Sequence, residues 1–271
     1  MTRREMLVGL SAAAATAAPQ GQVTPRQGRL KQCVTRGVFG KGMALEDMCR
    51  HAARLGVVGF DLIGPADFPL LKKYGLIPTM VSGAMTLAGG CNRTEDHPAA
   101  EKLMRELLDQ SAAAGAPNVI ALSGNRRGMP DLEGQDNVVA FLSKVKAQAE
   151  DKGVTICLEL LNSKVNHPDY QCDRTAWGVE VCKRVNSPRV KLLYDIYHMQ
   201  IMEGDVIRTI RNNLQWIGHF HTAGNPGRHE MDDTQEMNYK GIARAIADLN
   251  FPGYVAHEYS PVRDAVKSLE E

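Results

Sequence analysis

The sequence has almost no excess of charge of either sign, and this excludes several classes of protein. It has 32 basic and 31 acidic residues among 271, a formal net charge of +1. A general nucleic-acid binder would show a strong basic excess or a clustered basic patch. No run of about 18 or more strongly apolar residues occurs, so stable membrane insertion is not expected. The hydrophobic content of 44% is ordinary for a folded domain and excludes a disordered chain.

Paired cysteines are also lacking, although the chain has six of these residues. None of them forms the CxxC spacing that is typical of zinc sites. A core of this size does not need disulfide bonds, even in an exported protein. We therefore assign no function to the cysteines, which are Cys33, Cys49, Cys91, Cys157, Cys172 and Cys182.

The first residues differ in character from the rest of the chain. The pair Arg3-Arg4 precedes a weakly hydrophobic, alanine-rich stretch from Val8 to Ala18, which Pro19 ends. A charged start, a modest apolar stretch and small residues are the parts of an export signal, and the arginine pair is typical of the twin-arginine type. Residues 1–28 are thus predicted to be a twin-arginine signal and lead-in, which implies a periplasmic protein. The alternative is a cytoplasmic protein with a chance arginine pair.

From Lys31 onward, apolar β-type runs alternate with amphipathic helical patterns. Strands that are buried on both faces and alternate with helices indicate a parallel sheet. Eight such units in residues 29–271 predict an α/β fold, a single-domain (β/α)8 TIM barrel. An open doubly wound sheet is the competitor, but residues 36–40 do not match its GxGxxG loop. The apolar runs are Lys31–Thr35, Val57–Leu62, Ile77–Ser82, Asn118–Ser123, Val154–Leu160, Val190–Ile196, Trp216–Thr222 and Gly253–Tyr259.

Ionisable residues occur at the C-terminal ends of the last four runs, where the chemistry of such barrels is built. They are Glu159, Asp195, His221 and Glu258. An isolated charge inside an apolar strand is costly. Any one of these residues could be a buried ion-pair partner, but four at one end of the barrel indicate a site. His219 points the same way as His221 and should lie one layer deeper.

Two glutamates, one aspartate and one histidine form an oxygen-rich ligand set. Such a set suits a divalent metal ion such as Mn²⁺, Mg²⁺ or Co²⁺. A structural zinc site would contain more cysteine and histidine. His257 points away from Glu258 along its strand and should face the helix layer.

The ordered motifs of the chain resemble those of the hydroxypyruvate isomerase group. That group belongs to the xylose isomerase-like barrels, together with ketose 3-epimerases and endonuclease IV. The resemblance extends from Lys31 to Glu258. It rests on Ser123-Gly124-Asn125-Arg126, Glu159-Leu160-Leu161-Asn162-Ser163-Lys164, His167-Pro168-Asp169-Tyr170, Tyr194-Asp195-Ile196-Tyr197-His198-Met199-Gln200, Gly218-His219-Phe220-His221, Pro226-Gly227-Arg228-His229-Glu230 and Asn238-Tyr239.

The resemblance implies a role for each matching position. Glu159 and Glu258 match the glutamates that exchange the substrate proton and bind metal, and Asp195 and His221 match the other two metal ligands. His198 and Arg228 match residues that hold substrate oxygens in related epimerases.

The reaction class implied by the resemblance is proton transfer next to a carbonyl. The metal would polarise the C2 carbonyl of hydroxypyruvate, and the glutamate pair would move a proton through a cis-enediolate to give tartronate semialdehyde. Arg228 suits the substrate carboxylate, because its planar guanidinium pairs with two oxygens.

Several alternatives stay open at this point. The bacterial hydroxypyruvate isomerases carry Gln where this chain has His221, and His is the epimerase choice, so a ketose 3-epimerase or sugar-acid isomerase is the first rival. An abasic-site endonuclease would need further metal-binding histidines and a basic groove, against which the charge argues. A non-catalytic binding protein would have no need of both glutamates. A small-molecule substrate is the expected partner, and a homodimer is left open.

Overall fold

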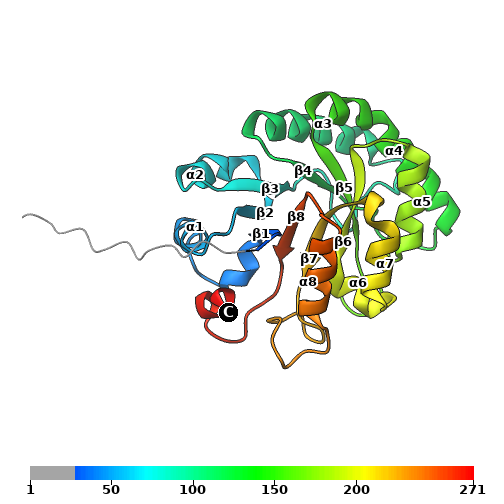
Figure 1. Ribbon diagram of the computed structural model, residues 1–271. Helices are drawn as coiled ribbons and strands as arrows, with labels where there is room; N and C mark the ends of the chain where they lie inside the picture. Colours follow the sequence, from blue (N-terminus) through cyan, green and yellow to red (C-terminus); the bar gives the residue numbers. More distant parts are fainter. Residues whose placement is uncertain (1–27) are drawn as a thin grey trace, which may run out of the picture.

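The computed structural model describes residues 28–271, so the predicted export signal lies outside the described residues except for Gly28. Those residues form a closed parallel barrel in which each strand pairs with the next and β8 pairs with β1 (Figure 1). The predicted TIM barrel is therefore confirmed, and each strand lies within two residues of its predicted bounds. The strands are β1 (Lys31–Val34), β2 (Gly59–Ile63), β3 (Ile77–Val81), β4 (Asn118–Ala121), β5 (Thr155–Leu160), β6 (Val190–Asp195), β7 (Ile217–Thr222) and β8 (Tyr254–His257).

Helices surround the barrel and cover the outer faces of its strands (Figure 1). Gly115 and Gly153 end two of them in the left-handed conformation, with φ of 72° and 68°, which glycine adopts without a side-chain clash. The helices are α1 (Leu45–Arg54), α2 (Phe68–Lys73), α3 (His97–Ala114), α4 (Asp131–Lys152), α5 (Thr175–Val185), α6 (Ile196–Met202), α7 (Val206–Asn213), α8 (Tyr239–Asp248) and α9 (Ala265–Glu270), with short 3₁₀ turns at Arg36–Phe39, Pro65–Asp67 and Leu214–Trp216.

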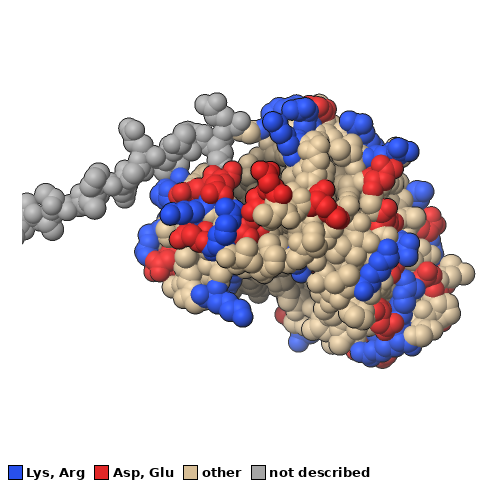
Figure 2. Space-filling view, turned by 90° about the horizontal axis from the view of Figure 1, so that it is seen from below, with Lys and Arg blue, Asp and Glu red and all other residues tan. Residues whose placement is uncertain are grey.

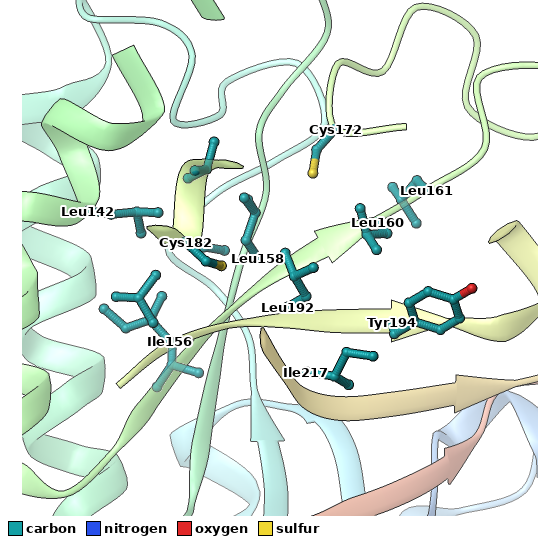
Figure 3. Close-up of a cluster of buried hydrophobic side chains, with 14 of the residues drawn as sticks. Leu142, Ile156, Leu158, Leu160, Leu161, Cys172, Cys182, Leu192, Tyr194 and Ile217 are labelled. Carbon is teal, nitrogen blue, oxygen red and sulfur yellow. The ribbon is translucent and has the colours of Figure 1, made fainter. Parts of the chain in front are cut away.

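Alternation along each strand decides which side chains enter the barrel. On β5, Ile156, Leu158 and Leu160 face outward into the core beneath the helices, where they lie beside Leu142 and Cys182 (Figure 3). The residues between them, Cys157 and Glu159, face inward, and Cys157 belongs to a separate buried cluster inside the barrel. An inward carboxylate at the end of β5 is thus the consequence of a packed outer face.

Strand β2 breaks this alternation. Its pairing with β3 shifts register between Phe60 and Asp61 and again between Asp61 and Ile63. Leu62 has a φ of 54°, a left-handed conformation that is strained for a leucine. Phe60 and Ile63 pack outward against the helices, whereas Leu62 packs against the cluster inside the barrel. The irregularity therefore directs two consecutive side chains, Asp61 and Leu62, to the interior.

The surface of the molecule carries both signs of charge. Figure 2 shows acidic and basic side chains interspersed on one face. Among the described residues, no helix combines the length and hydropathy needed to cross a membrane. All six cysteines are buried and form no disulfide bond.

Candidate metal centre and substrate site

Four ionisable side chains from consecutive strands meet at the C-terminal end of the barrel. Glu159 lies next to the last residue of β5, and Asp195 is the last residue of β6. His221 lies next to the last residue of β7, and Glu258 is the first residue after β8. One potential ligand atom of each lies within 4.8 Å of the others. The four residues that the sequence singled out as metal ligands are therefore neighbours in space.

His221 is the centre of this group. Its Nδ1 lies 2.8 Å from Oε2 of Glu258, 3.7 Å from Oε1 of Glu159 and 3.9 Å from Oδ2 of Asp195. The side chain of His221 is fully buried, those of Asp195 and Glu159 are nearly so, and that of Glu258 is 20% exposed. The group is thus closed on the barrel side and reaches solvent past Glu258.

Burial and the two neighbouring cations shift the pKa values of these carboxylates in different directions. Burial raises the pKa of Glu159 to about 8, with Glu258 and Asp195 adding to the shift and His221 opposing it. Burial also raises the pKa of Asp195. Burial alone would raise the pKa of Glu258, but His221 and Arg228 lower it to about 2. Close carboxylates with shifted pKa values are typical of functional sites.

His221 is held from the other side by Asp61. Its Nε2 lies 3.0 Å from Oδ2 of Asp61, and the same oxygen lies 2.5 Å from Nε2 of His219. Thr79 donates to the other carboxylate oxygen. His219 thus lies one layer deeper than His221, as its position in the strand predicts.

Cys33, Asp61 and His219 also bring three potential ligand atoms within 4.8 Å. This group differs from the first in that hydrogen bonds already satisfy it. Asp61 accepts from three donors, and the amide of Asn118 lies 3.4 Å from Nδ1 of His219. Burial raises the pKa of the Cys33 thiol well above its usual range, which disfavours the thiolate that a metal needs.

His198 has a defined tautomer because Asn162 fixes it. The oxygen of Asn162 accepts from the backbone N–H groups of Val165 and Asn166, so its amide nitrogen must face His198. That nitrogen donates to Nδ1 of His198 at 2.5 Å. The ring proton of His198 is therefore on Nε2, which is buried and has no hydrogen-bond partner among residues 28–271. Burial, with Arg228, lowers the pKa of His198 well below its usual value, so the ring is neutral.

Arg228 lies across the open side of the group. Its Nη2 is 2.7 Å from Oε2 of Glu258 and 3.9 Å from Oδ2 of Asp195, and its guanidinium lies over the ring of Tyr197 at 5.6 Å. The backbone of Arg228 has a φ of 58°, and its carbonyl accepts from the N–H of Ser260 at 2.8 Å. The pair of His198 and Arg228 that the sequence predicted thus borders the four candidate ligand residues.

Two cavities flank this arginine. One, of about 240 Å³, is lined by Glu159, Glu258, Arg228 and His167, and its other walls are mainly apolar. The second, of about 310 Å³, is more polar; its lining includes Arg36, Asp61 and Ser260 as well as Arg228 and Glu258. A larger cavity of about 420 Å³ lies elsewhere, between β8 and α8, and His257 lines it together with Ile242. His257 faces the helix layer, as expected.

Sequence reasoning missed three residues of this region. Asp61 lies inside the run Val57–Leu62, and a charge in an apolar strand is the signal that revealed the other four. Asn162 and His167 lie in the loop after β5, inside motifs that carry the resemblance, but nothing in their spacing distinguishes their roles. The Nε2 of His167 is buried and has no hydrogen-bond partner within the described part of the chain, and His167 lines the smaller cavity.

Comparison with known proteins agrees with the fold. The family model described as "xylose isomerase-like TIM barrel" matches residues 69–271. A crystal structure of an AP endonuclease of family 2 from Brucella melitensis superimposes with a TM-score of 0.78 at 22% identity, covering 89% of this chain and 96% of that one. D-Psicose 3-epimerase of Clostridium cellulolyticum H10, with D-tagatose, gives 0.72 at 19% identity, covering 89% of each chain. At these identities the likeness concerns the fold alone.

Curated relatives carry two kinds of name. A putative hydroxypyruvate isomerase of Danio rerio is 31% identical over 55% of this chain and 54% of its own length. A 2-oxo-tetronate isomerase of Cupriavidus necator is 36% identical over 42% of this chain and 43% of its own. The chain thus spans about half the length of these two relatives. A 2-oxo-tetronate isomerase of Haemophilus influenzae is 27% identical over 83% of this chain and 91% of its own.

Proposed function

The chain belongs to the xylose isomerase-like TIM barrel family, and from this premise we propose that it is a metal-dependent isomerase of hydroxy-keto acids. The proposed reaction converts hydroxypyruvate into tartronate semialdehyde. One observation carries the proposal: the convergence of Glu159, Asp195, His221 and Glu258 within 4.8 Å at the end of the barrel where substrates bind.

The residues present fit a divalent metal ion. Three carboxylates and one imidazole nitrogen form a donor set that suits Mn²⁺, Mg²⁺ or Co²⁺. The carboxylates are buried beside one another, and His221 and Arg228 are the cations in contact with them. A divalent cation bound there supplies Lewis-acid polarisation of the substrate carbonyl and stabilises negative charge on its oxygens.

Two residues are placed to hold the substrate. The Nε2–H of His198 is a buried, neutral donor beside Asp195, 3.6 Å from its Oδ2. It can donate to a substrate hydroxyl or carbonyl oxygen without carrying charge into the site. Arg228 borders both cavities and offers a planar guanidinium, which suits the carboxylate of a keto acid. The ion pair between Arg228 and Glu258 would open when the substrate carboxylate takes the place of Oε2.

The glutamates supply the proton transfer. Glu159 and Glu258 reach the same cavity from different strands, so a substrate between them has a carboxylate on either side. One removes the C3 proton of hydroxypyruvate, which gives a cis-enediolate. Return of a proton at C2, together with transfer of the hydroxyl proton from O3 to O2, gives tartronate semialdehyde. The apolar walls of this cavity would reduce the access of water to the enediolate.

The size of the two cavities favours a second candidate substrate for the same type of reaction. Together they provide room on both sides of Arg228, and hydroxypyruvate would fill only part of it. A four-carbon sugar acid would extend further, and relatives named 2-oxo-tetronate isomerase support this choice. A ketose 3-epimerase, for which His221 is typical, is the third substrate class to test.

Proton exchange in D₂O tests the proposal. Purified protein loaded with Mn²⁺ or Mg²⁺ is incubated with hydroxypyruvate, with a 2-oxo-tetronate or with ketoses. After chelation of the metal, NMR reads the products. We expect deuterium in hydroxypyruvate together with formation of tartronate semialdehyde. Exchange only in the tetronate, or only at C3 of a ketose, would move the assignment to that substrate. The absence of exchange with all of them would overturn it.

A further inference from the structure

We propose that Asp61 is a positioning residue that fixes His221 in the tautomer able to bind the metal. This inference rests on the proposed metal site and adds a residue from β2, on the side of the barrel away from the four ligand strands. It assigns Asp61 no contact with substrate. Its role is to act through the imidazole of His221.

The two ring nitrogens of His221 have different surroundings. Nε2 lies 3.0 Å from Asp61, whereas Nδ1 faces the three carboxylates of the site, with Glu258 at 2.8 Å. A buried carboxylate can only accept a hydrogen bond, so the proton on Nε2 is fixed by Asp61. In the metal-free site Nδ1 also donates, to Oε2 of Glu258 at 2.8 Å. A metal ion would displace that proton, and the neutral imidazole would then keep its proton on Nε2 and direct the lone pair of Nδ1 into the site.

The carboxylate of Asp61 is itself held rigidly. The N–H of His219 donates to the same oxygen at 2.5 Å, and Thr79 donates to the other one. The tautomer of His219 is fixed in turn, because the amide of Asn118 donates to the carbonyl of Thr79 at 2.9 Å and so turns the same nitrogen toward Nδ1. Rotation of Asp61 away from His221 would break these bonds inside a fully buried layer.

The backbone of β2 is irregular and strained beside Asp61. The left-handed Leu62 and the two register shifts beside it send Asp61 and Leu62 inward together. A regular strand would place only one of them in the barrel. Strained conformations of this kind persist where the surrounding structure holds them, and they concentrate at functional sites.

A carboxylate behind a ligand histidine has two effects on metal binding. It orients the ring, and it makes the ligating nitrogen more basic. Loss of such a partner typically weakens metal binding by about 10–100-fold. We expect an effect of this size at Asp61, although that residue lies on the far side of His221 from the metal.

Titration of Mn²⁺ into chelator-treated full-length protein tests this role. Asp61→Asn keeps the size of the side chain and removes its charge. Its dissociation constant for Mn²⁺ should rise at least about tenfold, while the metal-free variant still folds, as circular dichroism would show. Thr79→Val is the matched control: it removes a donor to the same carboxylate but leaves both imidazole bonds, so its effect on Mn²⁺ affinity should be clearly smaller than that of Asp61→Asn.

Pulsed electron paramagnetic resonance of bound Mn²⁺ adds a signature that a merely structural role would not change. Nitrogen coupling from a ligating imidazole should be present in the wild-type protein, absent in His221→Ala and weakened in Asp61→Asn. Wild-type affinity and unchanged nitrogen coupling in Asp61→Asn would overturn the inference alone. Failure of the wild-type protein to bind Mn²⁺ would instead overturn the proposed metal site, and this inference with it.

Discussion

Two layers of polar side chains lie one above the other in the barrel, and they differ in how completely they are satisfied. In the deeper layer, Asp61 receives hydrogen bonds from Thr79, His219 and His221. In the upper layer, the carboxylates of Glu159 and Asp195 face Nδ1 of His221 at 3.7 and 3.9 Å, beyond hydrogen-bond distance. The deeper layer is complete as it stands, whereas we propose that a cation completes the upper layer.

The pKa values express the same difference. Burial would raise the pKa of Asp61, but His219 and His221 hold it well below its usual range. Glu159 has no comparable partner, and its pKa rises to about 8. Both carboxylates are buried, so the difference comes from the donors around them. Burial in this barrel therefore does not by itself distinguish a candidate ligand from a satisfied carboxylate.

The largest expected effect is that of removing the metal. A chelator should abolish turnover, and Mn²⁺, Mg²⁺ or Co²⁺ should restore it, because only the upper layer depends on a cation. Added metal should also raise the melting temperature, because binding at a concentration of 100 times the dissociation constant adds about 2.7 kcal/mol to the free energy of unfolding. Turnover and thermal unfolding that ignore both chelator and metal would contradict this interpretation.

Next in size is the loss of a proton-transferring glutamate. Glu258→Gln should lower turnover by a factor of about 10²–10⁴ while the fold is retained, because an amide cannot take up the substrate proton. Steady-state kinetics with hydroxypyruvate and the other proposed substrates measure the change. Glu101→Gln, the same substitution on the surface helix α3, should leave turnover unchanged. If Glu258→Gln kept a tenth of the activity, Glu258 could not be an essential base.

A third prediction concerns the stability of the metal-free protein. The pKa of Glu159 rises from an ordinary value of 4.5 to about 8 in the fold. Between these values the folded protein keeps a proton that the unfolded chain has lost. The stability contributed by this proton is present below about pH 4.5 and is lost as the pH rises through about 8.

Glu159→Gln should remove this pH dependence. Relative to the wild type, the metal-free variant should gain stability as the pH rises toward 8, by an amount on the order of a few kcal/mol. Chemical denaturation at a series of pH values measures the gain. A difference between the two proteins that stays constant with pH would show that Glu159 is already compensated in the fold, as Asp61 is.

A smaller effect is expected at Asn162. Asn162→Ala removes the donor that fixes the proton of His198 on Nε2, so the ring can turn its acceptor nitrogen toward the substrate. One lost hydrogen bond of about 1–1.5 kcal/mol corresponds to a fall of about tenfold in kcat/KM. The metal affinity, measured by titration, should not change. A variant that lost metal binding as well would connect Asn162 to the upper layer instead.

The sequence predicts the barrel and the four ligand positions for one physical reason. Charged side chains are rare inside strands that are buried on both faces, so Glu159, Asp195, His221 and Glu258 are conspicuous. The alternation of each strand then determines that His219 lies deeper than His221 and that His257 faces the helices. These inferences need only local pattern and the geometry of the pleat.

Among the missed residues, Asp61 carries a local signal, a charge inside an apolar strand, whereas Asn162 carries none. The irregular backbone of β2 brings Leu62 into the barrel beside Asp61, and a regular alternation would place their side chains on opposite faces. The role of Asn162 depends on which ring nitrogen of His198 it contacts across 36 residues. The twin-arginine signal stays a prediction, because it lies outside the described residues.

A crystal structure of the protein with Mn²⁺, with anomalous diffraction used to locate the metal, tests the central claim most directly. We expect one anomalous peak among Glu159, Asp195, Glu258 and Nδ1 of His221, with the hydrogen bond from Nε2 of His221 to Asp61 intact. A peak at Cys33, Asp61 and His219, or no peak in either layer, would contradict the account.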